Sequence, residues 1–299
     1  MRNLVVLGIV GLVAQLVDGS LGMGFGVTSS TLLIAAGIAP ATASASIHLA
    51  EVGTTLLSGA AHHRLGNVDW RVVGILALPG GLGAFVGAHF LVSLPAEVAK
   101  PWVAALLFSL GVYVIWRFLM LDGRRPQFHG RLSARFLMPV GLVGGALDAV
   151  GGGGWGPVGT TSLLSSGRVS PRHAVGSVSA SEFVVAVGGS LGFLSALGAA
   201  GINLGFVVAL LAGGVVAAPL AAWLVRHLPA AVLGVAAGGL ILLTNSQTVL
   251  DSVGVPGAAR GLAALALGAM WVSLVAVAVR RHRRATDPAL VLGVVGSPS

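Results

Sequence analysis

Residues 11–26, GLVAQLVDGSLGMGFG, and residues 141–156, GLVGGALDAVGGGGWG, are two copies of one motif. Aligned with an offset of 130 residues, they pair Gly11 with Gly141, Asp18 with Asp148, Gly22 with Gly152, Gly24 with Gly154, Phe25 with Trp155 and Gly26 with Gly156. A hydroxyl-rich stretch follows each copy, at residues 28–31 and 160–162. Chance is a poor explanation for paired Asp, aromatic and glycine positions in one order, so the motif predicts an internal repeat.

The repeat extends over most of the chain. With one residue inserted, Pro40 aligns with Pro171 and Glu51 with Glu182. We therefore divide the chain into a first transmembrane repeat at 1–120, a basic linker at 121–136, a second transmembrane repeat at 137–250, an extra C-terminal transmembrane helix with a basic end at 251–284, and a tail at 285–299.

The composition indicates that the solvent of this chain is a lipid bilayer. Hydrophobic residues make up 56% of its 299 residues and charged residues only 9%, whereas a soluble domain carries about 25% charged residues. Such a chain cannot cover a globular surface with polar groups, which excludes a soluble enzyme. Its length accommodates about eight to ten membrane segments. We expect an all-α polytopic membrane protein.

The distribution of arginine predicts the topology. The net charge of +8 comes mainly from arginines at the expected membrane edges, a pattern typical of membrane orientation rather than of nucleic-acid binding. The basic stretches 121–136 and 280–284 are expected on the cytoplasmic side, so the C-terminus is cytoplasmic. Positive charge then changes sides at three matched pairs of loops: 62–71 with 199–203, 94–97 with 226–230, and 37–42 with 168–173. An odd number of crossings per copy produces this switch, which predicts two inverted-topology repeats.

The glycine runs are expected to break membrane helices. The apolar segments on each side of a run are too short to span the bilayer alone, so we expect re-entrant hairpins of half-helices that restart near Val27 and Pro157. The free N–H groups and positive dipole ends of these half-helices suit a small oxyanion. The alternative is that the glycines only allow close helix packing, as Gly83 and Gly87 are expected to do.

The predicted anion-binding residues lie in both copies of the motif. They are Gly22, Gly24, Phe25, Gly26, Thr28 and Ser29 in the first copy, and Gly152, Gly154, Trp155, Gly156, Thr160 and Thr161 in the second. The hydroxyl groups add hydrogen-bond donors to the backbone amides. The two aromatic side chains either wall or gate the site, or pack as ordinary apolar residues.

Four acidic residues fall within apolar segments, where charge is costly and usually functional. Glu51 and Glu182 are candidates for proton coupling, together with His48, which lies one turn before Glu51 on the same helix face. The alternative is a neutral glutamic acid bonded to a neighbouring helix. Asp18 and Asp148 precede the glycine runs and are expected to accept backbone N–H bonds there, with a coupling role as the alternative. The scattered histidines and the absence of cysteine predict no metal site, no cofactor and no catalytic constellation.

These motifs together resemble the TauE/SafE sulfite exporter family. The resemblance rests on D-x-x-x-G-x-G-x-G at residues 18–26, on the G-x-x-P turn at 37–40, on the return of both elements at 148–156 and 167–171, and on GNVDW at 66–70. It covers nearly the whole chain. It implies a secondary carrier that moves sulfite, sulfonates or related organosulfur anions across the bacterial cytoplasmic membrane.

The sequence therefore predicts a secondary transporter, not an enzyme, that works by alternating access. Its expected partners are the bilayer and a small anion such as sulfite, sulfoacetate or isethionate held at the half-helix N-termini, and no nucleic acid. A channel or facilitator for a small solute, built on the same half-helices, is the alternative.

Overall fold

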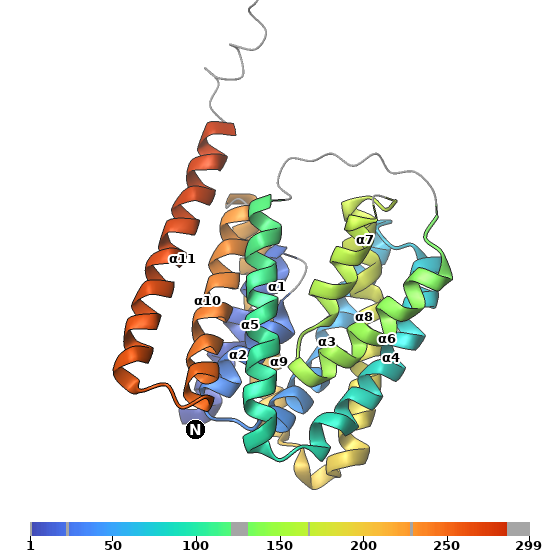
Figure 1. Ribbon diagram of the computed structural model, residues 1–299. Helices are drawn as coiled ribbons and strands as arrows, with labels where there is room; N and C mark the ends of the chain where they lie inside the picture. Colours follow the sequence, from blue (N-terminus) through green and yellow to red (C-terminus); the bar gives the residue numbers. More distant parts are fainter. Residues whose placement is uncertain (1, 22–23, 121–130, 167, 228–229, 286–299) are drawn as a thin grey trace, which may run out of the picture.

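The computed structural model describes all residues except 1, 22–23, 121–130, 167, 228–229 and 286–299, and the described residues are helical without strands. The helices, shown in Figure 1, are α1 (Arg2–Leu21), α2 (Phe25–Ala35), α3 (Pro40–Arg64), α4 (Trp70–Ser93), α5 (Ala96–Met120), α6 (Ala134–Gly151), the π-helical turn η1 (Gly156–Thr160), α7 (Thr161–Ser165), α8 (Pro171–Leu197), the short 3-10 turn η2 (Ala199–Gly201), α9 (Leu204–His227), α10 (Ala230–Ser252) and α11 (Gly257–Ala285).

Six described helices are long and apolar enough to cross a membrane: α4, α5, α6, α8, α10 and α11. Shorter apolar helices lie at Leu4–Asp18, Phe25–Ala35 and Leu204–Ala217. The prediction of an all-α polytopic membrane protein is therefore confirmed.

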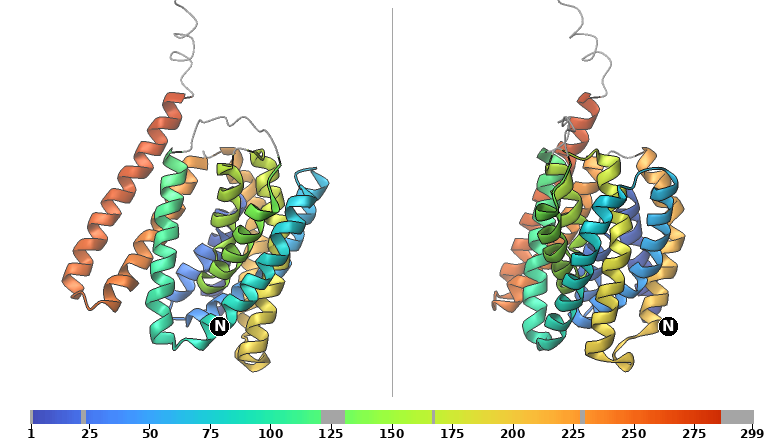
Figure 2. Two further views of the ribbon diagram at one scale, coloured as in Figure 1. Left: turned by 45° about the vertical axis from the view of Figure 1, so that its right-hand side comes forward. Right: turned by 90° about the vertical axis from the view of Figure 1, so that its right-hand side faces the viewer.

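Glycines let the helices of the bundle approach closely. Helix α4 lies between α6 and α8, α1 packs on α9, and α5 packs on α10 (Figure 2). A side chain at Gly83 or Gly87 of α4 would overlap the backbone of Leu142 or Ala146 in α6, and one at Gly145 of α6 would overlap the backbone of Gly80. Backbones in this contact leave no room for a Cβ, so glycine is required for the helices to pack this tightly.

Both glycine motifs interrupt a helix. Helix α1 ends at Leu21 and α2 begins at Phe25, and α6 ends at Gly151 before η1 begins at Gly156. These restarts lie within two residues of the expected positions. Gly24 and Gly152 have φ angles of 130° and 69°, which L-residues with a side chain rarely adopt, so each break depends on a glycine.

The two interrupted segments enter the bundle from opposite ends. In Figure 1, α1 runs up from the lower end and α2 leads back to it, whereas α6 runs down from the upper end and α7 leads back up. The α3–α4 connection lies at the upper end with the C-terminal ends of α5 and α11, and the α4–α5 and α8–α9 connections lie at the lower end. Two inverted-topology repeats are expected to place the ends in this way. Thiol labelling can test on which side of the bilayer each end lies.

We predict that cysteines at Leu65 and Ala199 will react with membrane-impermeant thiol reagents from opposite sides of the membrane. Both positions are exposed, at the α3–α4 and α8–α9 connections respectively, and the chain has no native cysteine to add background. Labelling of intact cells and of inverted vesicles measures the side. Labelling of both cysteines from one side would contradict the inverted topology.

Candidate functional site

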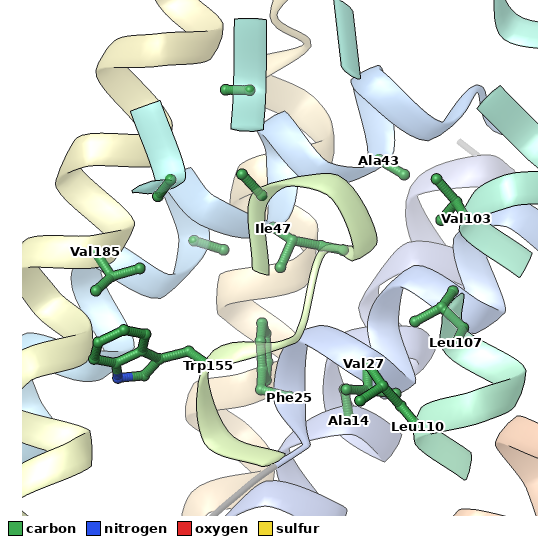
Figure 3. Close-up of a cluster of buried hydrophobic side chains, with 14 of the residues drawn as sticks. Ala14, Phe25, Val27, Ala43, Ile47, Val103, Leu107, Leu110, Trp155 and Val185 are labelled. Carbon is green, nitrogen blue, oxygen red and sulfur yellow. The ribbon is translucent and has the colours of Figure 1, made fainter. Parts of the chain in front are cut away.

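The two helix breaks meet in the middle of the bundle. A Cβ built on Gly26 would overlap the carbonyl oxygen of Gly152, and a Cβ built on Gly153 would overlap the backbone nitrogen of Val27. Figure 3 shows this region, with Val27 from the first break and Trp155 from the second on either side of Phe25 and Ile47. Backbone contact between described residues thus joins the first break to the second.

The paired aspartates hold the two restarts in the same way. Asp18 Oδ1 accepts a hydrogen bond from the backbone N–H of Phe25 at 3.4 Å, and Asp148 Oδ1 accepts one from that of Trp155 at 2.9 Å. In each case the acceptor lies seven residues before the donor. The first N–H groups of a helix have no intrahelical partner, and a carboxylate there also interacts favourably with the helix dipole. Each aspartate therefore caps a half-helix inside the bundle.

Several hydroxyl groups near the breaks are buried without a partner. The side chains of Thr28, Ser29 and Ser30 in α2 and of Thr160 in η1 are at most 1% exposed, and their oxygens accept or donate no hydrogen bond to the described residues. A buried hydroxyl left unsatisfied costs about 1–3 kcal/mol. Such a concentration of unsatisfied groups is unusual and indicates a place for a polar ligand or water.

The adjacent hydroxyls are already engaged. Thr31 Oγ1 accepts a hydrogen bond from Asn245 Nδ2 of α10 at 2.8 Å, and Thr161 Oγ1 donates to the carbonyl oxygen of Pro157. Arg117 Nη1 of α5 donates to Thr161 Oγ1 at 2.8 Å, and its side chain is only 8% exposed. A buried guanidinium therefore lies at the second half-helix. Nothing in the sequence distinguishes Arg117 from an interfacial anchor, which is the usual role of an arginine in the last turn of an apolar helix.

The two aromatic residues of the motif are packed. Trp155 is fully buried, its Nε1–H donates to the carbonyl oxygen of Val178 at 3.1 Å, and its ring fills the space beside Gly80 and Gly144. Phe25 is 4% exposed and lies against Gly214 of α9. This geometry favours packing over gating. The hydrogen bond from Trp155 to Val178 also connects the start of the second half-helix to α8.

The acidic residues converge on the same region. His48 and Glu51 of α3 and Asp148 of α6 are buried, and one polar atom from each lies within 4.8 Å of the others. His48 Nε2 is 3.3 Å from Asp148 Oδ2. Glu51 also interacts electrostatically with Glu182 of α8 and Asp18 of α1, so acidic side chains surround the contact between His48 and Asp148. Nothing in the sequence indicates that His48 meets Asp148, 100 residues away.

The remaining predicted glycines have separate roles. Gly24 precedes α2 as its N-cap residue, and a Cβ on Gly154 would crowd the backbone at Leu147 and Asp148. Gly156 is buried in the first turn of η1. Gly22 lies outside the described residues, so its predicted role in anion binding stays a prediction.

Comparison with known proteins identifies relatives across most of the chain. The family described as Sulfite exporter TauE/SafE matches residues 7–248. "Probable membrane transporter protein YtnM" of Bacillus subtilis (strain 168) is 48% identical over 276 residues, which cover 92% of each chain. "Probable membrane transporter protein YdhB" of the same organism is 28% identical over 179 residues, covering 59% of this chain and 72% of the relative. No solved structure matches.

We predict that Gly153→Ala will destabilise the protein by about 1–3 kcal/mol, because the added methyl group must displace the backbone at Val27. Gly74→Ala in α4 is the matched control, since a Cβ there meets nothing within 4 Å and alanine favours a helix over glycine. Thermal unfolding in one detergent should show a lower Tm for Gly153→Ala and an equal or higher Tm for Gly74→Ala. Equal melting of the two variants would argue against contact between the breaks.

Proposed function

The chain belongs to the TauE/SafE sulfite exporter family, and from this premise we propose that it is a secondary carrier for a small sulfur oxyanion or organosulfonate. The family model matches residues 7–248, and a probable membrane transporter matches over 92% of the chain. Together with six described helices that are long and apolar enough to cross a bilayer, these matches make it a multi-pass membrane transporter. We propose the bacterial cytoplasmic membrane as its location, with the C-terminus in the cytoplasm. The substrate and the mechanism are argued below from the residues at the helix breaks.

The observation that carries this proposal is the set of buried, unpartnered hydroxyls at both half-helices. Thr28, Ser29 and Thr160 offer O–H donors without competing protein acceptors. A sulfonate or sulfite group presents several oxygens around one sulfur atom, and each oxygen accepts hydrogen bonds. Neutral hydrogen-bond donors and helix N-termini can bind such an anion without a metal ion. The proposed contacts are therefore the hydroxyls together with backbone N–H groups of the two restarts.

An anion at this position also needs positive charge, because four carboxyl groups lie nearby. Each half-helix N-terminus supplies the equivalent of about half an elementary charge, although Asp18 and Asp148 already use part of it. Arg117 adds a full positive charge at Thr161. We propose that Arg117 attracts the anion to the second half-helix. Protonation of nearby carboxyl groups would lower the remaining repulsion.

The contact between the two breaks supports alternating access over an open channel. With Gly26 packed on Gly152 and Val27 packed on Gly153, the described residues form a closed centre. The anion would gain access when one half-helix hairpin moves relative to the other and exposes the hydroxyls to one side. Two hairpins that enter from opposite ends would open the site toward opposite sides in turn.

We predict counterflow in proteoliposomes that contain the purified protein. Vesicles preloaded with unlabelled isethionate should accumulate external labelled isethionate transiently above its equilibrium level, because a carrier exchanges bound anions across the membrane. Sulfite and sulfoacetate serve as competing anions, and protein-free vesicles as the control. Uptake that never overshoots and never saturates would favour a channel or facilitator instead.

We predict that Thr28→Val and Thr160→Val will each weaken anion binding by about 1.5–3 kcal/mol, the usual value for a hydrogen bond to a charged group. This corresponds to roughly a tenfold to hundredfold rise in Kd. Thr28→Ser is the matched control and should bind nearly as well as the wild type, since it keeps the hydroxyl. Thermal-shift titration with isethionate, sulfoacetate and sulfite measures the Kd. Unchanged affinity in the double valine variant would remove the hydroxyls from the site.

A further inference from the structure

We propose that His48, Glu51 and Asp148 form a buried site for one exchangeable proton, and that Asp148 transmits its occupancy to the second half-helix. The inference rests on the proposed function, in which this proton is the ion coupled to the anion. Asp148 then joins the proton site at Glu51 and His48 to the anion site.

The orientation of the His48 ring is the first support. Its Nδ1 lies 2.9 Å from the carbonyl oxygen of Ser44, and a carbonyl oxygen only accepts hydrogen bonds, so Nδ1 carries a hydrogen. The other ring nitrogen, Nε2, therefore has either a lone pair or a second proton. Gly189 and Phe193 of α8 pack against the ring, and a Cβ on Gly189 would overlap it.

The contact between His48 and Asp148 requires a proton. Nε2 is 3.3 Å from Asp148 Oδ2, and neither atom has another hydrogen-bond partner among the described residues. A bare Nε2 lone pair facing a carboxylate oxygen at this distance is repulsive. One proton, on either atom, turns the same contact into an attraction. Glu51 Oε2 is likewise buried and unpartnered, and it offers a second acceptor for that proton.

The surrounding charge favours occupancy of the site. Glu51 interacts with Asp148, with Glu182 of α8 and with Asp18 of α1, all of them acidic. Uncompensated charge is costly in a buried site, so a proton here offsets part of the negative charge. An anion that binds at the neighbouring half-helices adds further negative charge. Anion and proton therefore strengthen each other's binding, and thermodynamic linkage makes the effect reciprocal.

Asp148 connects the two sites through its two oxygens. Oδ1 accepts the backbone N–H of Trp155 at the start of the second half-helix, while Oδ2 faces His48. Next to it, the Ser44 hydroxyl donates to the carbonyl oxygen of Ala149 at 2.6 Å, which fixes α3 against the end of α6. Loss of the proton makes Oδ2 repel His48, and any shift of the carboxylate disturbs the cap on Trp155. The start of the second half-helix therefore changes when the proton is lost.

Among the described residues, no histidine forms such a contact with Asp18 at the first half-helix. Asp18 caps Phe25 in the same manner, but the alignment that pairs Glu51 with Glu182 places Ser179 where the first copy has His48. A serine does not change its charge in the physiological range. We therefore expect an imidazole to affect only Asp148 and the second half-helix. Asp18, which caps the first half-helix, serves as the control residue in the experiments.

The site itself is tested without any anion. Full-length protein in lipid nanodiscs, washed with EDTA, is titrated from mildly acid to mildly alkaline pH while infrared difference spectra record carboxyl and imidazole bands. We expect one buried group to lose one proton, and we expect this step to be lost in Glu51→Gln and Asp148→Asn and displaced in His48→Gln. Asp251→Asn, at an exposed position of α10, should titrate like the wild type. The same step in every variant would overturn the proposal.

A second measurement tests the role of Asp148 as a positioning residue. Trp155 is buried directly beside the capped N–H, so its fluorescence, obtained as the difference between the wild type and Trp155→Phe, should change over the pH range of the infrared step. His48→Gln should abolish this change without removing the cap, so the test does not depend on whether Asp148→Asn folds. Asp18→Asn should retain the change. If Trp155 fluorescence in the wild type did not change with pH, the second half-helix would not respond to the proton.

Anion binding separates this inference from the proposed function. Isethionate stays fully ionised over the range, and above the infrared step its Kd should rise about tenfold per pH unit if one proton accompanies each anion. Saturable, pH-independent isethionate binding would leave the carrier standing and overturn the coupling. Infrared and fluorescence steps without isethionate binding would support the proton site and refute isethionate as cargo. An infrared step that appears only after Zn²⁺ or Mn²⁺ is added would assign the cluster to a metal instead.

Discussion

A polypeptide that breaks a helix inside a bilayer must find hydrogen-bond partners for the backbone groups that the break exposes, because lipid offers none. In this protein Asp18 and Asp148 meet part of this requirement, each by accepting one backbone N–H where the helix restarts. A carboxylate can do so only where the protein surrounds it, which places both breaks in the middle of the bundle. The close helix packing at Gly83, Gly87 and Gly145 encloses them there. Capping and glycine packing are therefore two parts of one solution.

The sequence predicts the parts of this arrangement that are local or repeated. The glycine runs and the paired aspartates indicate broken helices, and the breaks lie where expected, because glycine acts on the conformation of its own backbone. The composition and the apolar segments predict the helical membrane fold for the same reason. Repetition strengthens each inference, since Asp18 and Asp148 occur in equivalent positions.

Contacts between distant segments could not be predicted in the same way. That the two breaks touch, so that Gly26 lies on Gly152, depends on the packing of the whole bundle and not on either motif. The approach of His48 to Asp148 and of Arg117 to Thr161 likewise needs the relative positions of α3, α5, α6 and η1. Whether Trp155 packs or gates could not be predicted either, because the hydrogen bond that favours packing reaches Val178 on another helix.

The combination of buried acids with donors for an anion is the electrostatic problem that the fold has to solve. In the proposed site, four carboxylates at this depth would repel a sulfonate, whereas two half-helix N-termini, Arg117 and the unpartnered hydroxyls would attract it. The two tendencies are reconciled if some of the carboxyl groups carry protons when the anion is present. Charge balance then makes the proton a requirement for anion binding rather than an addition to it. The second copy has Ser179 where the first has His48. This difference fits the proposed mechanism, in which one imidazole responds to the charge state at one of the two half-helices, and only that half-helix has to move in response.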